Sequence, residues 1–210
     1  MSEALYPSPE RLSFPKAEAR HDWLAPLLEA YYVTDRGVHE GVRRQQRQGR
    51  NLACDKGCGS CCETHTTIPV YPLELVGLYW FATEQIEGEI RDRLRNSLRT
   101  FGKGDPCPFL LDERCSVHPM RPMACRHFNV FGKSCARGED AYHTRRQDVL
   151  TPIRRYQDEA FFHLLPYHGV KSKGERRQAI KKGTVHALAK VLQDLDWSRL
   201  ADRMDAFDRD

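Results

Sequence analysis

The stretch Cys54-Asp-Lys-Gly-Cys58-Gly-Ser-Cys61-Cys62 places four cysteines close together in a polar segment that contains two glycines. The other four cysteines of the chain lie downstream, at Cys107, Cys115, Cys125 and Cys135. Thiolates gathered in loops that have no apolar stripe are what a soft metal ion or an iron–sulfur cluster requires of a protein. The sequence therefore predicts a metal-binding protein, with all eight cysteines as candidate ligands.

The length and composition of the chain indicate one folded unit. With 210 residues and 40% hydrophobic content, the chain can bury one core and is short for two. Residues 1–15, rich in proline, serine and charge, are expected to form a flexible N-terminal arm. Residues 16–210 are predicted to form a single domain, with the cysteine module at about 52–137. The net charge of +4 is too small to indicate nucleic acid, so a nucleic-acid partner is not expected.

The N-terminal sequence favours a cytoplasmic location. Met1–Pro9 has neither a basic start nor an apolar stretch typical of a signal peptide, and no later segment is long enough to span a bilayer. We therefore expect no membrane partner. In a reducing compartment, clustered cysteines are kept as thiols or bind metal, which makes a disulfide framework the weaker interpretation.

The apolar pattern predicts a mostly α fold, a single compact helical domain with irregular cysteine-rich loops organised around a metal centre. Apolar residues recur at helical spacing in the stretches 24–31, 73–80, 90–101, 153–164, 180–195 and 197–207. The polar stretch up to Arg50 is expected to continue as a second helix. Pro72 and the pair Thr151-Pro152 suit helix starts, and His168-Gly169 suits a helix end.

Two of these stretches also predict which side chains are buried. Val76 in 73–80 and Ile90 in 90–101 are expected to face the core, and Arg91, in the second of these two stretches, is expected to face solvent. Residues 102–138 lose all periodicity and are dense in glycine, proline, cysteine and arginine. The conformation of such a segment is expected to depend on ligation instead of an apolar face.

The spacing in the first loop suits a thiolate site. Two residues between Cys58 and Cys61 let both sulfurs face one ion while backbone N–H groups point at the sulfurs. In extended backbone, the side chain of Cys62 points away from that of Cys61. The adjacent pair could therefore feed two centres, or one centre plus a free thiolate. We favour one main centre that joins Cys58, Cys61 and Cys62 to cysteines of the second loop.

Basic and imidazole groups flank the cysteines. Four thiolates around a divalent ion leave a net negative charge, which nearby cations offset through hydrogen bonds. Candidate cations are Lys56, Arg114, Arg121, Arg126 and Lys133, of which Arg121 and Arg126 are expected to support the cofactor from behind the ligands. Three histidines could complete a mixed site, although a surface or core role is favoured for any one of them: His65, His118 and His127.

Other interpretations of the same residues remain open. Cysteines are often buried as small apolar side chains, and a thioredoxin-like redox pair also uses Cys-x-x-Cys. A redox pair of that kind should open a helix after a strand, and the residues after Cys62 predict no convincing helix. Basic runs at 43–47 and 171–182 are interpreted as solvated helix faces.

The motif Cys58-Gly59-Ser60-Cys61-Cys62 resembles the YkgJ-like cysteine-cluster family, described as zinc- or iron-chelating domains with a CxxCxxCC signature. The second half of the resemblance is Cys107-Pro108-Phe109-Leu110, then Cys115 through Cys125-Arg126 with the internal Arg121-Pro122. Three residues separate Cys54 from Cys58, where the signature has two, so the role of Cys54 is less defined than that of Cys58. The resemblance implies metal or cluster binding and little about a reaction.

Three functional hypotheses therefore remain. The first is a cytosolic protein whose cysteines bind zinc or iron, including a [4Fe-4S] cluster, with or without catalysis. The second is a non-catalytic structural zinc module whose helical surface recruits a protein or RNA partner. A flagellin lysine methylase carries a similar cysteine cluster, so the third is iron–sulfur-dependent methyl transfer to lysine. No glycine-rich turn between a strand and a helix is evident for an adenosyl cofactor.

Overall fold

The fold comes from a computed structural model that describes residues 6–55 and 57–209. Within these ranges the chain is mostly helical, as predicted, and its two sheets are small. The α-helices are α1 (Pro15–Arg20), α2 (Leu24–Arg47), α3 (Ser60–Thr64), α4 (Pro72–Glu84), α5 (Gly88–Thr100), α6 (Met123–His127), α7 (Ala141–Thr144), α8 (Arg154–Leu164), α9 (Lys173–Lys182) and α10 (Ser198–Phe207).

The shorter elements connect these helices. The antiparallel strand pairs are β1 (Pro69–Val70) with β4 (Lys190–Val191), and β2 (Leu110–Leu111) with β3 (Arg114–Cys115). The 3₁₀ turns are η1 (His118–Met120), η2 (Arg146–Asp148), η3 (Leu165–His168), η4 (Thr184–Leu188) and η5 (Leu192–Asp194).

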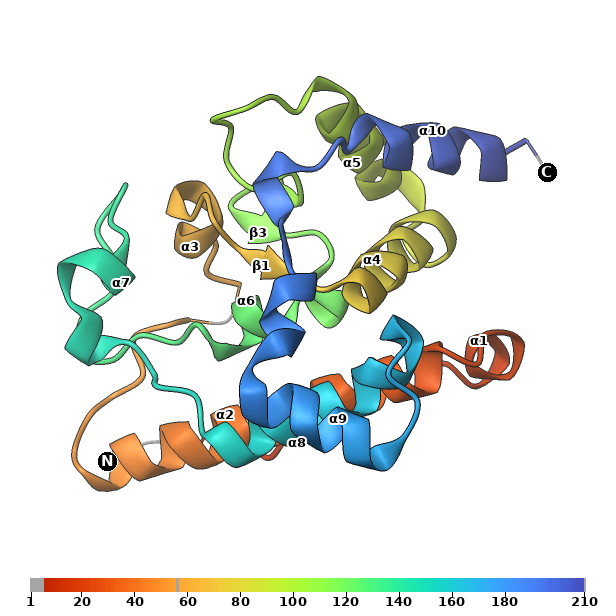
Figure 1. Cartoon of the computed structure of the whole chain (residues 1–210). Helices are drawn as coiled ribbons and strands as arrows, with labels where there is room; N and C mark the ends of the chain where they lie inside the picture. The colour runs from red at the N-terminus through yellow and green to blue at the C-terminus, as the bar shows by residue number, and fades with distance from the viewer. Residues whose placement is uncertain (1–5, 56, 210) are drawn as a thin grey trace.

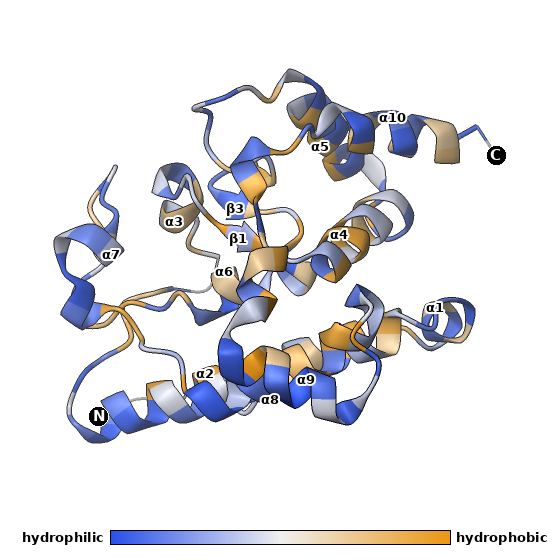
Figure 2. Ribbon diagram, viewed as in Figure 1, coloured by the Kyte–Doolittle hydropathy of each residue, from blue (hydrophilic) through white to orange (hydrophobic). Residues whose placement is uncertain are grey.

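Two groups of helices enclose the cysteine-bearing segments. The long helix α2 packs along α8, and α10 packs against α4 and α5. Between the two groups lie α3, α6 and the strands, while the segment around α7 projects to one side (Figure 1). Hydrophobic residues gather on the inner faces of α4 and α8, and the projecting segment is mostly hydrophilic (Figure 2). No helix in the described ranges is both long and apolar enough to cross a membrane.

Helix α2 is continuous, so the prediction of two helices before Arg50 was wrong. Its polar half keeps a narrow buried face of Val38, Gly41 and Val42. A Cβ atom at Gly37 would lie 2.8 Å from the Cβ of Tyr156, and the two helices pack closely because that atom is absent. Small residues on one face therefore extend the helix contact where the large apolar residues stop.

Arg91 is buried, contrary to the expectation that it faces solvent. Its guanidinium donates to the carbonyls of Ala82, Thr83 and Ile86 at the end of α4, and its Nη2 lies 2.6 Å from Asp208 after α10. These contacts satisfy carbonyls that a helix end leaves without partners. Arg91 therefore joins three helices.

Several apolar and boundary expectations also differ from the structure. The side chains of Val76 and Ile90 are exposed, although both were expected in the core. Helix α8 begins at Arg154 after Ile153, later than the Thr151-Pro152 start that was predicted. Its continuation η3 ends at Gly169, which adopts φ 82°, as the His168-Gly169 prediction required.

The stripe 180–195 is not one helix. Helix α9 ends at Gly183, with φ 71°, and the chain then forms η4, β4 and η5. The following helix, α10, was predicted correctly, with Leu200 and Met204 buried, although Phe207 at the end of the predicted stripe is exposed.

The N-terminal residues lie against the core from residue 6 onward. Arg11 pairs with Glu18 at 2.9 Å, and the ring of Phe14 contacts that of Trp80 edge-on at 5.1 Å. Residues 1–5 of the predicted arm lie outside the described ranges.

Candidate metal centre

Cys61 and Cys62 lie on the short helix α3, which follows the loop that contains Cys58. The prediction of extended backbone here was wrong, so the two side chains are separated by a helical turn angle of about 100° instead of pointing to opposite sides. Cys62 is buried and Cys61 partly exposed. A redox pair of the thioredoxin type would open a longer helix after a strand, and α3 has only five residues.

The first cysteine loop touches the second through two backbone contacts. The N–H of Cys107 donates to the carbonyl of Cys62 at 2.7 Å. Gly59 packs so closely on the hairpin turn that a Cβ atom there would lie 2.1 Å from the carbonyl oxygen of Glu113. The hairpin β2–β3 carries Cys115 in its second strand. These contacts bring the two halves of the sequence pattern together.

Five thiols form an inner group beside the main core. Cys62 and Cys107 belong to the core, and the others pack against it: Cys61, Cys115 and Cys125. The thiols of Cys61, Cys62 and Cys107 are near enough to shift one another's pKa. The neighbouring Cys62 thiol, with burial, raises the pKa of the Cys61 thiol. Burial and the charges of Cys61 and Cys115 raise the pKa of Cys125.

The remaining thiols form an outer group: Cys54, Cys58 and Cys135. Burial raises the pKa of Cys54 to about 11, and the charges of Cys58, Cys61 and Cys135 act in the same direction. The N–H of Val130 donates to Cys54 Sγ at 3.3 Å. The Nη2 of Arg145 lies 3.6 Å from Cys135 Sγ. Donors aimed at sulfur stabilise thiolates, so these two contacts suit ligation.

The thiols of the chain are the donors that a soft metal prefers, although their sulfur atoms do not already form a coordination shell in the described residues. Within residues 6–55 and 57–209, no three cysteine, histidine or acidic side chains already surround one point. Sulfurs that each lie about 2.3 Å from one tetrahedral ion are about 3.8 Å apart, close to the contact distance of neighbouring thiols. The inner thiols already contact one another, so a metal would need to draw them together over short distances.

Comparison with known families supports the same chemistry. Residues 53–149 match the family CxxCxxCC, described as "Putative zinc- or iron-chelating domain". The matched segment contains all eight cysteines. No curated protein and no solved structure matches the chain. The CxxCxxCC domain reaches past residue 137, where the cysteine module was expected to end, and includes α7.

Arg126 supports the second loop of the CxxCxxCC domain from within. It is 4% exposed, and its guanidinium pairs with Asp35 of α2 at 2.6 Å and lies 4.1 Å above the ring of Tyr31. It also donates to the carbonyls of Pro119 and Arg121. These contacts anchor the turn that leads into α6 and Cys125.

The other candidate cations differ in position. Arg121 contacts the ring and carbonyl of His118. Burial raises the pKa of Cys115, and the N–H of Val117 and the charge of Arg121 oppose that rise. Arg114 and Lys133 are exposed, and Lys56 lies outside the described ranges.

Glu74 is a buried carboxylate that the motif analysis missed. It accepts hydrogen bonds from the N–H groups of Tyr71 at 2.9 Å and Met123 at 2.7 Å. Burial raises its pKa to about 7, against the opposing effect of those two bonds. Glu74 thereby ties the start of α4 to the start of α6, which carries Cys125. Because Glu74 lies within a stretch that has ordinary helical periodicity, its sequence position did not indicate this role.

A cavity of about 400 Å³ opens beside the inner thiols. Cys61, Cys62 and Cys125 form part of its lining, and His65 and Asp140 form another part. The Nε2 of His65 lies 3.2 Å from Asp140, and the His65 ring packs edge-on against Phe128. Asp140 follows the last cysteine and lay beyond the segment expected to form the site.

Of the other two histidines, His127 is the more buried. Burial lowers its pKa to about 4, and its Nδ1 has no hydrogen-bond partner within the described ranges. His118 contacts Arg121.

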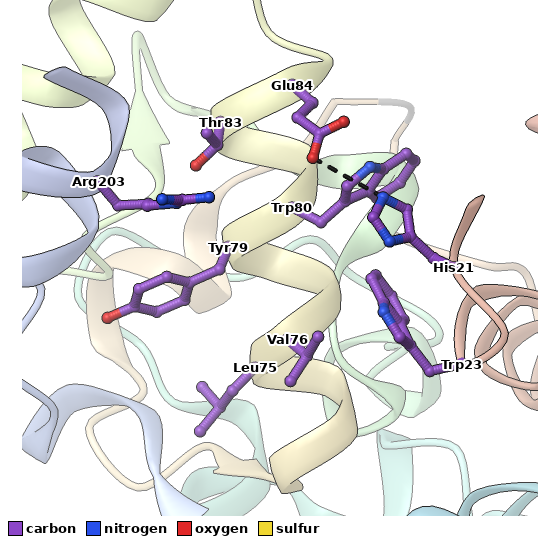
Figure 3. Close-up of a pocket in the computed structure, with 9 residues that line it drawn as sticks. All are labelled: His21, Trp23, Leu75, Val76, Tyr79, Trp80, Thr83, Glu84 and Arg203. Atoms are coloured by element: carbon purple, nitrogen blue, oxygen red, sulfur yellow. Dashed lines mark ion pairs between the residues drawn. The ribbon is translucent and has the colours of Figure 1, made fainter. Parts of the chain in front are cut away.

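A second hollow, of about 480 Å³, lies on the face of α4 and contains no cysteine. Figure 3 shows Trp23 and His21 on one side of the helix and Tyr79 and Arg203 on the other. His21 Nε2 lies 3.9 Å from Glu84. Its lining shares no residue with that of the cavity beside the thiols.

Proposed function

We propose that the chain binds zinc or iron through thiolates contributed by both cysteine loops. One observation carries this proposal: Cys61, Cys62 and Cys107 come from segments far apart in sequence and meet at the core, where the N–H of Cys107 donates to the carbonyl of Cys62. Small apolar residues would bury there equally well, but thiols of this number next to one another are the ligand set of soft metals. The CxxCxxCC match supports the same chemistry.

The electrostatic environment explains why a cation belongs in the centre. Burial and neighbouring thiols raise the pKa values of Cys61, Cys62 and Cys125, so these groups hold their protons at neutral pH. A bound cation stabilises the thiolates and replaces those protons. The metal would also fix residues 102–122, which have only short regular elements.

Metal uptake is therefore expected to release protons. Each thiol that becomes a ligand loses one proton, about four for a closed tetrahedral thiolate site. Apparent affinity should fall as the pH falls, by about tenfold per pH unit for each proton released. Zinc added to metal-free chain in weak buffer with an indicator dye measures the release directly. Uptake of zinc at constant pH, with no proton released, would contradict thiol ligation.

Replacing Cys107 with serine tests the joining of the two loops. We expect the variant to lose metal from the inner thiols and to melt at lower temperature, because Cys107 is the second loop's contact with Cys62. Elemental analysis of anaerobically purified protein measures the metal and separates zinc from iron; iron–sulfur protein is brown and zinc protein colourless. A variant with wild-type metal content and melting temperature would show that Cys107 is not a ligand. Ser116→Ala, in the same loop, serves as the sulfur-free control.

A second candidate function is a catalytic metal centre, which the cavity beside the inner thiols supports. Structural zinc sites are closed, whereas catalytic sites keep a position open to a small molecule. Cys61, Cys62 and Cys125 border the cavity on which His65 and Asp140 also lie. Binding of cyanide to cobalt-substituted Cys135→Ser chain, in which the thiols beside the cavity are intact, tests this candidate when followed in the visible spectrum. An unchanged spectrum at saturating cyanide would favour the closed structural site and the non-catalytic module.

A further inference from the structure

Seven of the eight cysteines pack in two separate apolar environments, and Cys58 lies exposed outside both. The inner five lie in or against the main core, which also contains Phe109 and Trp197. Cys54 and Cys135 instead pack against a small cluster formed by Val130, Ala141 and Val149. A single centre that used both sets would have to connect two apolar clusters.

The small cluster around Cys54 and Cys135 is formed by extended segments that contain none of the five inner cysteines. Leu52 bridges Phe131, and the N–H of Ala53 donates to the carbonyl of Val130 at 2.8 Å. On the other side, Val130 bridges Val149. Cys54 follows the first of these segments, and Cys135 follows the turn at Gly132, where φ is 83°. The backbone thus places the two cysteines at neighbouring positions by its own hydrogen bonds.

A fixed cation stands behind the outer thiols. Arg145 is 6% exposed, and it is held by Glu139 at 2.8 Å and Asp148 at 3.4 Å. Its Nη2 reaches Cys135 Sγ, while the N–H of Val130 reaches Cys54 Sγ. Three thiolates around a divalent ion carry one net negative charge, which a buried guanidinium in contact offsets.

We propose that the chain holds two divalent metal ions of the zinc type, an inner one on thiolates among Cys61, Cys62, Cys107, Cys115 and Cys125, and an outer one on Cys54, Cys58 and Cys135. This inference rests on the proposed function. The outer ion has three protein ligands, and water completes its coordination. Because Cys58 is exposed whereas Cys62 and Cys107 are buried, the outer ion exchanges faster.

Zinc stoichiometry and release distinguish two sites from one. Metal-free chain is loaded anaerobically with Zn²⁺, excess ion is removed, and release to the chelating dye 4-(2-pyridylazo)resorcinol is followed in time. We expect two equivalents, released in two phases whose rates differ at least tenfold. Cys135→Ser should lose the fast equivalent and keep the slow one, and Cys107→Ser should show the reverse. Arg137→Gln, at an exposed side chain two residues after Cys135, should keep both.

Alkylation of the wild-type chain provides a test that needs no variant to fold. After the fast zinc has left, iodoacetamide should modify Cys54, Cys58 and Cys135 and spare the inner five, as read by peptide mass spectrometry. Two results would overturn the division into two metal sites and leave the proposed function intact. One is a single equivalent of zinc that both Cys135→Ser and Cys107→Ser abolish, and the other is uniform alkylation of all eight cysteines. A wild-type chain that binds no zinc or iron would overturn the proposed function and this inference with it.

Discussion

Gly59→Ala is expected to separate the two cysteine loops. The added Cβ would lie 2.1 Å from the carbonyl oxygen of Glu113, a backbone atom that cannot rotate away. The φ of Gly59 is −110°, which alanine adopts readily, so the effect is purely steric. We expect a loss of about 3 kcal/mol in the free energy of unfolding, the upper range for overpacking. Inner metal should be lost as well, because Cys61 and Cys62 follow Gly59 by two and three residues.

Urea unfolding of metal-free chain and metal analysis of loaded chain measure the two effects separately. Gly174→Ala is the matched control: among the described residues, nothing beyond its chain neighbours and its own helix backbone lies within 4 Å of a Cβ at Gly174, and the stability of this variant should change little. If Gly59→Ala matched the wild type in both assays, the close contact between α3 and the β2–β3 turn would not be part of the folded protein.

Arg126→Met is expected to destabilise the chain by about 3 kcal/mol. The substitution removes the partner of Asp35 and the donors that satisfy the carbonyls of Pro119 and Arg121. Removing one member of a buried ion pair costs about 3–5 kcal/mol, and Asp35 is partly hydrated, so the lower end applies. Methionine retains the apolar contact with Tyr31, so the measured loss reports the polar contacts.

Thermal and urea unfolding of the metal-free chain check this value. Arg44→Met is the control, since Arg44 is mostly exposed and pairs only with Glu40 within the described ranges; a change below about 0.5 kcal/mol is expected there. A similar small change in Arg126→Met would show that Arg126 is not a structural anchor. Arg126 was expected to support the metal ligands from behind, and its contacts indicate a larger role in the fold.

The sequence predicted the helical class and the cysteine motif because both are local patterns. The two groups of thiols were not predictable in the same way, since they depend on which backbone segments pair. Leu52 and Phe131 are adjacent only because two extended segments align, and neither segment carries a strong strand pattern. Arg145 and Asp140 follow the last cysteine, where no motif marks them.

Two other differences between the predicted and the observed fold depend on tertiary contacts that periodicity does not show. The continuity of α2 depends on Gly37 and Gly41, which lie against Tyr156 and Leu150. Helical periodicity is recognised from large apolar residues, so it does not indicate a helix contact that is made by glycines. Arg91 was misassigned for a related reason, because its burial depends on the helix end and the acidic partner that it meets.

X-ray absorption spectroscopy of the metal-loaded chain tests the central claim most directly, because it reports the atoms bound to the ion. We predict sulfur ligands at about 2.3 Å from the metal, and a smaller sulfur contribution in Cys107→Ser. A wild-type spectrum that contains only nitrogen and oxygen ligands would contradict the account.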